Sequence, residues 1–187
     1  MELPGSGMGE QRIVKIIEAD AAVLDAHRDQ LAEMMAACVR EGASIGFVQP
    51  FAVDDAAHFW RTRVRPAVDG GGARLFLGLS DTRTVVGTVQ LVLPTMPNQT
   101  HKAEIAKMMV HPSHRRQGIA RALMTTVMDA ARGQGFRVLT LDTRSGDPAQ
   151  ALYASFGFKV AGDIPDFAID PDDPAKLDPT TYMYARL

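Results

Sequence analysis

The stretch Val110–Ala131 sets two adjacent arginines and a glycine against the start of an amphipathic helix pattern. Its sequence, VHPSHRRQGIARALMTTVMDAA, places Arg115, Arg116 and Gly118 directly before apolar residues that recur at intervals of three or four. The start of a helix presents unpaired N–H groups and a partial positive charge, which together stabilise a bound anion. Glycine also lets a ligand approach the backbone closely. The pattern therefore predicts a phosphate-binding corner, with a solvated basic turn as the alternative.

The composition narrows the possible partners. With 187 residues and 46% hydrophobic content, the chain is expected to form one domain over residues 12–187, preceded by a Gly-rich, flexible tail at 1–11. A net charge of -2 provides no general basic field, so neither nucleic acid nor an anionic membrane is expected as a partner. The chain contains neither an NTPase phosphate loop (G-x-x-x-x-G-K-[ST]) nor a dinucleotide fingerprint (G-x-G-x-x-G after a strand).

Cysteine and histidine usage predicts neither a disulfide nor a metal site. The single cysteine, Cys38, excludes an intrachain disulfide, and the histidines are too scattered for a metal-site assignment. The chain also has no apolar run of about 18 residues and no charged-then-apolar start typical of a secretory signal. We therefore expect a cytoplasmic protein without a metal cofactor.

Hydrophobic periodicity predicts alternating strands and helices. Strands are expected at 12–19, 74–80, 84–94, 102–110, 137–143, from 158 and at 181–187, and helices at 20–42, after Asp54, before Gly133 and at 147–157. A long Asp- and Pro-rich loop is expected to run up to Thr180. The order βααβββαβαββ indicates an α/β fold with a mixed central sheet and helices on both faces, whose ligand site lies beyond the carboxyl ends of the strands.

Two motifs in this order resemble those of the GCN5-related N-acetyltransferase (GNAT) superfamily. The segment Arg115–Ala120 fits the superfamily's pyrophosphate loop, Q/R-x-x-G-x-G/A, and ALYASFGF at Ala151–Phe158 is similar to its L-Y-x-x-x-G-F helix end. The element order also matches, from Arg12 to Leu187. The resemblance implies the acetyl-CoA acyltransferase fold, acetyl-CoA as co-substrate and transfer of an acetyl group to an amine.

The resemblance also implies which residues bind the cofactor. The main chain at the end of the strand before the loop would hydrogen-bond the pantetheine arm, and backbone N–H groups of the loop would bind the pyrophosphate. These residues are Met108, Met109 and Val110 for the arm, and Arg115, Arg116, Gln117, Gly118, Ile119 and Ala120 for the pyrophosphate.

Two residues are the candidates for proton transfer. Tyr153 occupies the position of the superfamily's general acid, with helix-end packing as the alternative role. Glu104 lies as far before Arg115 as the catalytic glutamate of the histone acetyltransferase branch, and desolvation in an apolar strand would raise its pKa toward that of a useful base. The alternatives are a structural carboxylate paired with Lys102 or Lys107, and His101 or water as the base.

The resemblance implies that the acceptor enters between two segments, Glu41–Phe51 and 163–179. Phe47, Phe51 and Trp60 would supply an apolar wall, unless they serve helix packing. The segment 163–179 carries six aspartates that would attract a cationic amine, unless it is a solvated acidic loop. They are Asp163, Asp166, Asp170, Asp172, Asp173 and Asp178, of which Asp163 and Asp166 are the candidate acceptor contacts.

The sequence from Leu141 onward resembles a narrower group, the tabtoxin-resistance and kasugamycin-type antibiotic acetyltransferases. We therefore expect direct transfer, in a ternary complex, to a primary amine of a small antibiotic or toxin, either an aminoglycoside such as kasugamycin or a tabtoxinine-like compound. The alternatives are a protein lysine or N-terminal acetyltransferase and a non-catalytic CoA-binding sensor. A homodimer through the last strands is compatible with the sequence but not required by it.

Overall fold

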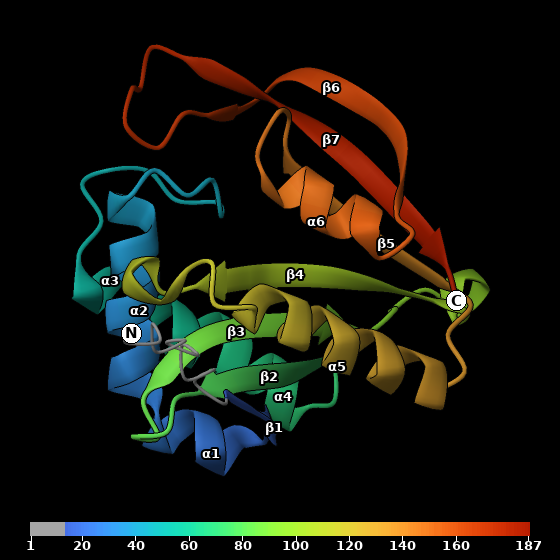
Figure 1. The fold of residues 1–187 in the computed structure, drawn as a ribbon, viewed down its shortest axis with the longest axis horizontal. Coiled ribbons are helices and arrows are strands. Elements are labelled where there is room, and N and C mark those ends of the chain that lie inside the picture. Colours follow the sequence, from blue (N-terminus) through green and yellow to red (C-terminus); the bar gives the residue numbers. More distant parts are fainter. Residues whose placement is uncertain (1–13) are drawn as a thin grey trace, which may run out of the picture.

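The computed structural model describes residues 14–187, so the expected tail at 1–11 lies outside the described residues. Seven strands form one sheet in the order β1-β2-β3-β4-β5-β7-β6 (Figure 1). Neighbouring strands are antiparallel except for β4 and β5, which are parallel. The strands are β1 Lys15–Ala19, β2 Ala73–Leu79, β3 Val85–Val92, β4 Lys102–Val110, β5 Val138–Arg144, β6 Lys159–Ile169 and β7 Leu177–Arg186.

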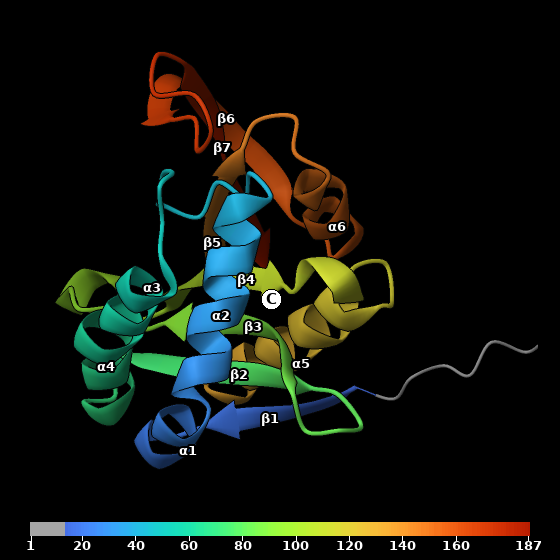
Figure 2. The same cartoon turned by 90° about the vertical axis from the view of Figure 1, so that its left-hand side faces the viewer.

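Helices cover both faces of the sheet, which confirms the expected fold class (Figure 2). Helix α2 packs on β3 and β4 within one hydrophobic cluster, and α5 packs on β2, β3 and β4 within the other. The helices are α1 Ala21–Ala26, α2 Arg28–Arg40, α3 Val53–Phe59, α4 Arg65–Asp69, α5 Ile119–Gly133 and α6 Ala149–Ser155. A π-helical turn at Trp60–Val64 joins α3 to α4, and 3-10 turns occupy Pro97–Gln99 and Pro112–His114.

Two predicted helices differ in their details. The helix expected at 20–42 is divided at His27, which leaves helical geometry (φ −109°, ψ 9°) and binds the Val23 carbonyl through Nδ1 at 2.9 Å. The second helix begins at Val53 instead of following Asp54, because Asp55 Oδ2 accepts a hydrogen bond from the Ala52 N–H at 2.9 Å. The capping carboxylate is therefore inside the helix.

The prediction of a long loop up to Thr180 is wrong. Strand β6 continues to Ile169 and β7 begins at Leu177, so the acidic segment is largely a β-hairpin. Its pairing skips from Ile164 to Ala168, and Asp166 within this bulge has a φ of 50°. Proline is tolerated in edge strands at bulges, which is where Pro165 lies. The proline and the aspartates, which are typical of loops, are therefore accommodated in an irregular edge strand.

Two facing glycines let α5 approach the sheet closely. Gly78 of β2 pairs with Gly87 of β3, and both lie under Ile119 at the start of α5. A Cβ atom on Gly87 would lie 3.0 Å from each of three atoms, namely Ile119 Cγ2, Leu123 Cδ1 and the Met109 carbonyl oxygen. The glycine thereby sets the position of the α5 N-terminus relative to the end of β4.

We predict that Gly87→Val destabilises the fold by about 1–3 kcal/mol, because the added side chain overpacks a well-filled interface. Urea denaturation measures this change. Gly133→Ala is the matched control, since a Cβ there meets no atom within 4 Å. It lies in the last turn of α5, and alanine should leave stability unchanged or raise it by up to about 1 kcal/mol. Equal stability of Gly87→Val and the parent protein would contradict the packing argument.

Candidate active site

Strands β4 and β5 pair over only three residues and then separate. The parallel pairing joins Lys102 to Val138, Ala103 to Leu139 and Glu104 to Thr140, where it ends. On its other side β4 stays paired with β3 as far as Val110. Within residues 14–187, the edge of residues 105–110 that faces β5 therefore has no strand partner, although its backbone N–H and C=O groups require one.

A bulge lies in this open half of β4. Pairing with β3 is interrupted between Ala106 and Met109, and Lys107 has a φ of 49°. The hydroxyl of Thr88 donates to the Lys107 carbonyl at 3.0 Å and fixes the irregular backbone. Bulges redirect side chains and often lie next to active sites, and here the bulge turns Lys107 into a cavity.

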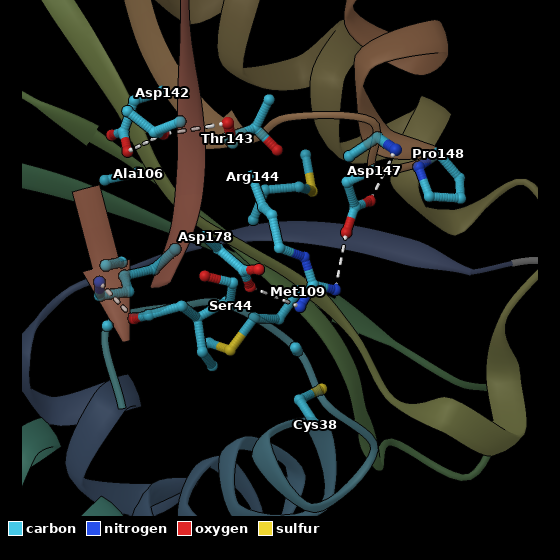
Figure 3. A pocket seen from close by; sticks show the side chains of 18 of the residues that line it. Cys38, Ser44, Ala106, Met109, Asp142, Thr143, Arg144, Asp147, Pro148 and Asp178 are labelled. Carbon is cyan, nitrogen blue, oxygen red and sulfur yellow. Dashed lines mark hydrogen bonds and ion pairs between the residues drawn. The ribbon is translucent and has the colours of Figure 1, made fainter. Parts of the chain in front are cut away.

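The cavity has a volume of about 560 Å³ and lies between β4, β5, the segment 41–46, the start of α6 and the β6–β7 hairpin (Figure 3). The segment after α2 and the hairpin turn meet where the Gln49 N–H donates to the Pro171 carbonyl at 2.8 Å. A Cβ on Gly42 would lie 2.9 Å from Asp172 Oδ2 at the same contact. The acceptor loops expected from the sequence therefore touch each other beside the cavity.

The predicted phosphate loop is open and rich in free donors. Gly118 is the N-cap of α5 with a φ of 81°, and Arg116 also has a positive φ of 63°. Within residues 14–187 the N–H groups of Arg116, Gln117 and Gly118 make no hydrogen bond. A Cβ on Gly118 would meet no atom of the described residues within 4 Å. With the first turn of α5, this loop can bind a diphosphate through the main chain, and Arg115 lines the adjoining cavity.

Tyr153 of α6 reaches the cavity from the apolar core. The side chain is buried beside Phe158, with the ring centroids 6.1 Å apart, and the residue lines the cavity. Burial, with a smaller contribution from Asp147 and Asp142, raises the pKa of Tyr153 to about 12. The phenol therefore stays protonated at neutral pH, as a proton donor must.

Two carboxylates lie on neighbouring strands where these separate. Glu104 of β4 and Asp142 of β5 both line the cavity. Partial burial raises the pKa of Glu104, the negative charge of Asp142 raises it further, and Lys102 and Lys107 lower it. Neither lysine forms an ion pair with Glu104 among the described residues. The structure therefore does not support the alternative in which Glu104 is a structural carboxylate paired with a lysine.

Three other charged groups at the cavity, Arg144, Asp147 and Asp178, are already paired (Figure 3). Arg144 Nη1 lies 3.4 Å from Asp178 Oδ2, and Arg144 Nη2 lies 3.5 Å from Asp147 Oδ2. Lys176 Nζ also contacts Asp178 at 2.9 Å, and its contact with Asp170 lowers the pKa of that carboxyl to about 2. These pairs tie β7 and the start of α6 to β5.

The remaining predicted acceptor contacts lie away from this cavity. Trp60 is fully buried and its indole N–H donates to the Leu31 carbonyl at 3.2 Å. His101 lies before β4, where its carbonyl accepts a hydrogen bond from the Arg137 N–H at 2.8 Å.

Asp163 and Asp166 are exposed on β6, where Asp163 accepts a hydrogen bond from the Thr181 hydroxyl at 2.6 Å. Phe47 borders a second hollow of about 580 Å³ with Phe51 and Phe59.

Asp142 and Arg144 line the cavity although the sequence analysis does not predict them there, and Lys107 enters that analysis only as a possible partner of Glu104. One signal was available, because Leu139 and Leu141 alternate with Thr140, Asp142 and Arg144 and so indicate one polar face of β5. Lys107 carried no such signal, since its direction depends on the bulge.

Within 14–187, no three His, Cys, Asp or Glu side chains are placed to share a metal ion. No helix in this part of the chain is long and apolar enough to cross a membrane.

Comparisons with known proteins agree with this geometry. An uncharacterised N-acetyltransferase of Azospirillum brasilense, from the hisH-hisA intergenic region, is 37% identical over 109 residues, 57% of this chain and 61% of the relative. Human N-acetyltransferase 8 is 37% identical over 94 residues, 49% of this chain and 40% of the relative. The chain thus spans about half the length of these curated relatives.

The fold recurs in solved acetyltransferase structures. A Salmonella typhimurium protein described as an acetyltransferase, solved with its cofactor acetyl-CoA, superposes with a TM-score of 0.72 at 21% identity over 94% of each chain. The sequence model described as the acetyltransferase (GNAT) family matches residues 46–158, which include the separating strands, the open loop and Tyr153. The chain therefore belongs to the GNAT family of acetyltransferases.

Proposed function

We propose that the chain transfers the acetyl group of acetyl-CoA to a primary amine of a small molecule. The observation that carries this proposal is the combination, around one cavity, of an unpaired strand edge, a loop of free N–H groups and a protonated phenol. These match the three parts of the donor, which are the pantetheine amides, the diphosphate and the thiolate that leaves.

The donor would bind mainly through the main chain. Pantetheine amides can replace the missing neighbour strand of β4 along Met108, Met109 and Val110. The diphosphate would accept hydrogen bonds from Arg115–Ala120 and gain from the partial positive charge of α5. The position of Arg115 at the cavity suits its guanidinium to a phosphate oxygen.

Direct transfer needs three proton movements. Glu104 would take a proton from the ammonium, and the neutral amine would then attack the thioester carbonyl to form the C–N bond. Collapse of the tetrahedral intermediate breaks the C–S bond, and Tyr153 would protonate the departing thiolate. The amine nitrogen loses its second proton as the amide forms, and this proton would restore the Tyr153 phenol. Burial raises the pKa of the Cys38 thiol, which argues against an acetyl-cysteine intermediate and supports a ternary complex.

The contact between Gln49 and Pro171 supports a small acceptor, because it joins the two segments that are expected to border the acceptor site. An antibiotic or toxin amine therefore remains our proposed acceptor.

A cytoplasmic location and a homodimer also remain predictions. Exposed Val160, Ile164, Phe167 and Tyr182 on the outer strands offer an apolar surface for the dimer, which light scattering after size-exclusion chromatography tests.

The direct test of function is thiol release from acetyl-CoA with an amine and peptide panel. Release with small amines and not with peptides supports the proposal. Release with peptides alone favours a protein acetyltransferase, and tight CoA binding without release favours a sensor.

Tyr153→Phe should lower kcat in this assay by about a hundredfold or more, because the leaving thiolate loses its proton donor. KM for acetyl-CoA should change little. Tyr182→Phe on the exposed face of β7 is the matched control and should keep full activity. Unchanged turnover of Tyr153→Phe would remove the tyrosine from the mechanism.

Gly118→Ala should weaken acetyl-CoA binding by about tenfold, because alanine strains a backbone with positive φ and displaces the donor loop. Titration calorimetry measures the Kd. Gly135→Ala carries a similar strain, since Gly135 has a φ of 80° at the other end of α5. It should lower stability but leave the Kd unchanged. Equal effects of both variants on the Kd would count against the loop.

Glu104→Gln should lower kcat about a hundredfold and remove the acidic limb of the pH–rate profile. Because the pKa of Glu104 is raised, activity of the parent should rise with pH through a value above the ordinary glutamate range. Asp142→Asn removes a negative charge that raises this pKa, so the limb should move to lower pH. A limb that survives Glu104→Gln and vanishes in Asp142→Asn would assign the base to Asp142.

A further inference from the structure

Lys107 contributes a cation to the cavity that the acetyl-transfer steps above do not use. Its Nζ donates to the Ile45 carbonyl at 2.9 Å and lies 5.9 Å and 5.7 Å from the ring centroids of Phe47 and Phe59. An ammonium has three N–H donors. The Ile45 carbonyl takes one of them, and the aromatic faces attract the charge without neutralising it.

The charge of Lys107 is not balanced by a contacting anion. Among residues 14–187, no carboxylate lies within 4.0 Å of its Nζ. Arg144, at the same cavity, contacts two carboxylates. Burial lowers the pKa of Lys107, whereas Asp142 and Glu104 raise it, so these carboxylates act on the ammonium without touching it.

The cavity therefore carries two complementary charged positions, although Asp142 Oδ2 already accepts a hydrogen bond from the Thr180 hydroxyl at 3.3 Å. Glu104 and Asp142 form a negative position at the point where β4 and β5 separate, and Lys107 forms a positive position at the bulge three residues further along β4. The ammonium of Lys107 is partly buried without a contacting carboxylate, which is costly, and a ligand that supplies the anion recovers this cost. A ligand bearing both an amine and an anion would fill both positions.

We propose that the acceptor is a small zwitterion with an anionic group close to its amine, as in an amino acid, and that Lys107 is the residue that selects it. This inference rests on the proposed function and narrows its acceptor class. The amine lies at Glu104 and Asp142, where it is deprotonated and acetylated. The anionic group accepts hydrogen bonds from the two remaining N–H donors of Lys107.

The inference distinguishes between the two classes of acceptor that the sequence leaves open, aminoglycosides and amino-acid toxins. A polycationic aminoglycoside would bring further positive charge toward Lys107 and would bind less well. An amino-acid toxin presents one ammonium and one carboxylate and matches both positions. Acetylation also removes the positive charge of the amine, so the product leaves Glu104 and Asp142 without a cation and binds more weakly than the acceptor.

The test compares L-amino acids with their α-carboxamides in the thiol-release assay. Each pair keeps the amine and the side chain and differs in the anionic group. The inference predicts kcat/KM at least about tenfold higher for the acids, the size expected when a hydrogen bond to a charged group is lost. Equal rates for acids and amides would overturn the inference while leaving acetyl transfer intact. Release with no amine of either kind would overturn the proposed function as well.

Lys107→Met and Lys107→Arg separate selection from a structural role. If Lys107 only anchors the segment at Ile45, Lys107→Met raises KM equally for an acid and its amide, and this result would overturn the inference. If Lys107 binds the anion, Lys107→Met raises KM for the acid about tenfold, leaves that for the amide unchanged and thus abolishes the preference. Lys107→Arg retains the charge and should retain part of the preference.

Discussion

The pairing of β4 with β5 ends at Glu104 and Thr140, and the arrangement of the cavity depends on this limit. Backbone groups of a buried strand need partners, so the open edge of β4 beyond Glu104 must be met by water or by a ligand rich in amides. The separation also exposes Glu104, Asp142 and Lys107 to one cavity. A fully paired β4 and β5 would leave neither the cavity nor a place for a pantetheine arm.

Packing elsewhere holds the two strands apart. On one side, the facing glycines of β2 and β3 bring α5 down onto the sheet, which places the phosphate loop at the end of β4. On the other side, β5 is paired along its whole length with β7 and is tied by Arg144 to Asp147 and Asp178. Each half of the sheet is thus held by its own strand pairing, and the junction between the halves is confined to three residue pairs.

The sequence was enough to predict the element order, an open loop at the start of α5 and a tyrosine near the end of α6, because these depend on local periodicity, on glycine and on a short motif. It was not enough for features that depend on register. Asp142 reaches Glu104 only through the parallel pairing, and Lys107 reaches the cavity only through a bulge opposite Thr88. The segment 163–169 was predicted to be a loop because Pro165 and the aspartates are typical of loops, yet long-range pairing with β7 makes it a strand.

Amide hydrogen exchange with and without acetyl-CoA tests the central claim most directly, because it measures the main-chain groups to which the claim refers. The account predicts slower exchange on adding acetyl-CoA in the open half of β4, Ile105–Val110, and in the loop Arg115–Ala120, with β1 and β2 unchanged. Binding of acetyl-CoA without protection of these two segments would contradict the account.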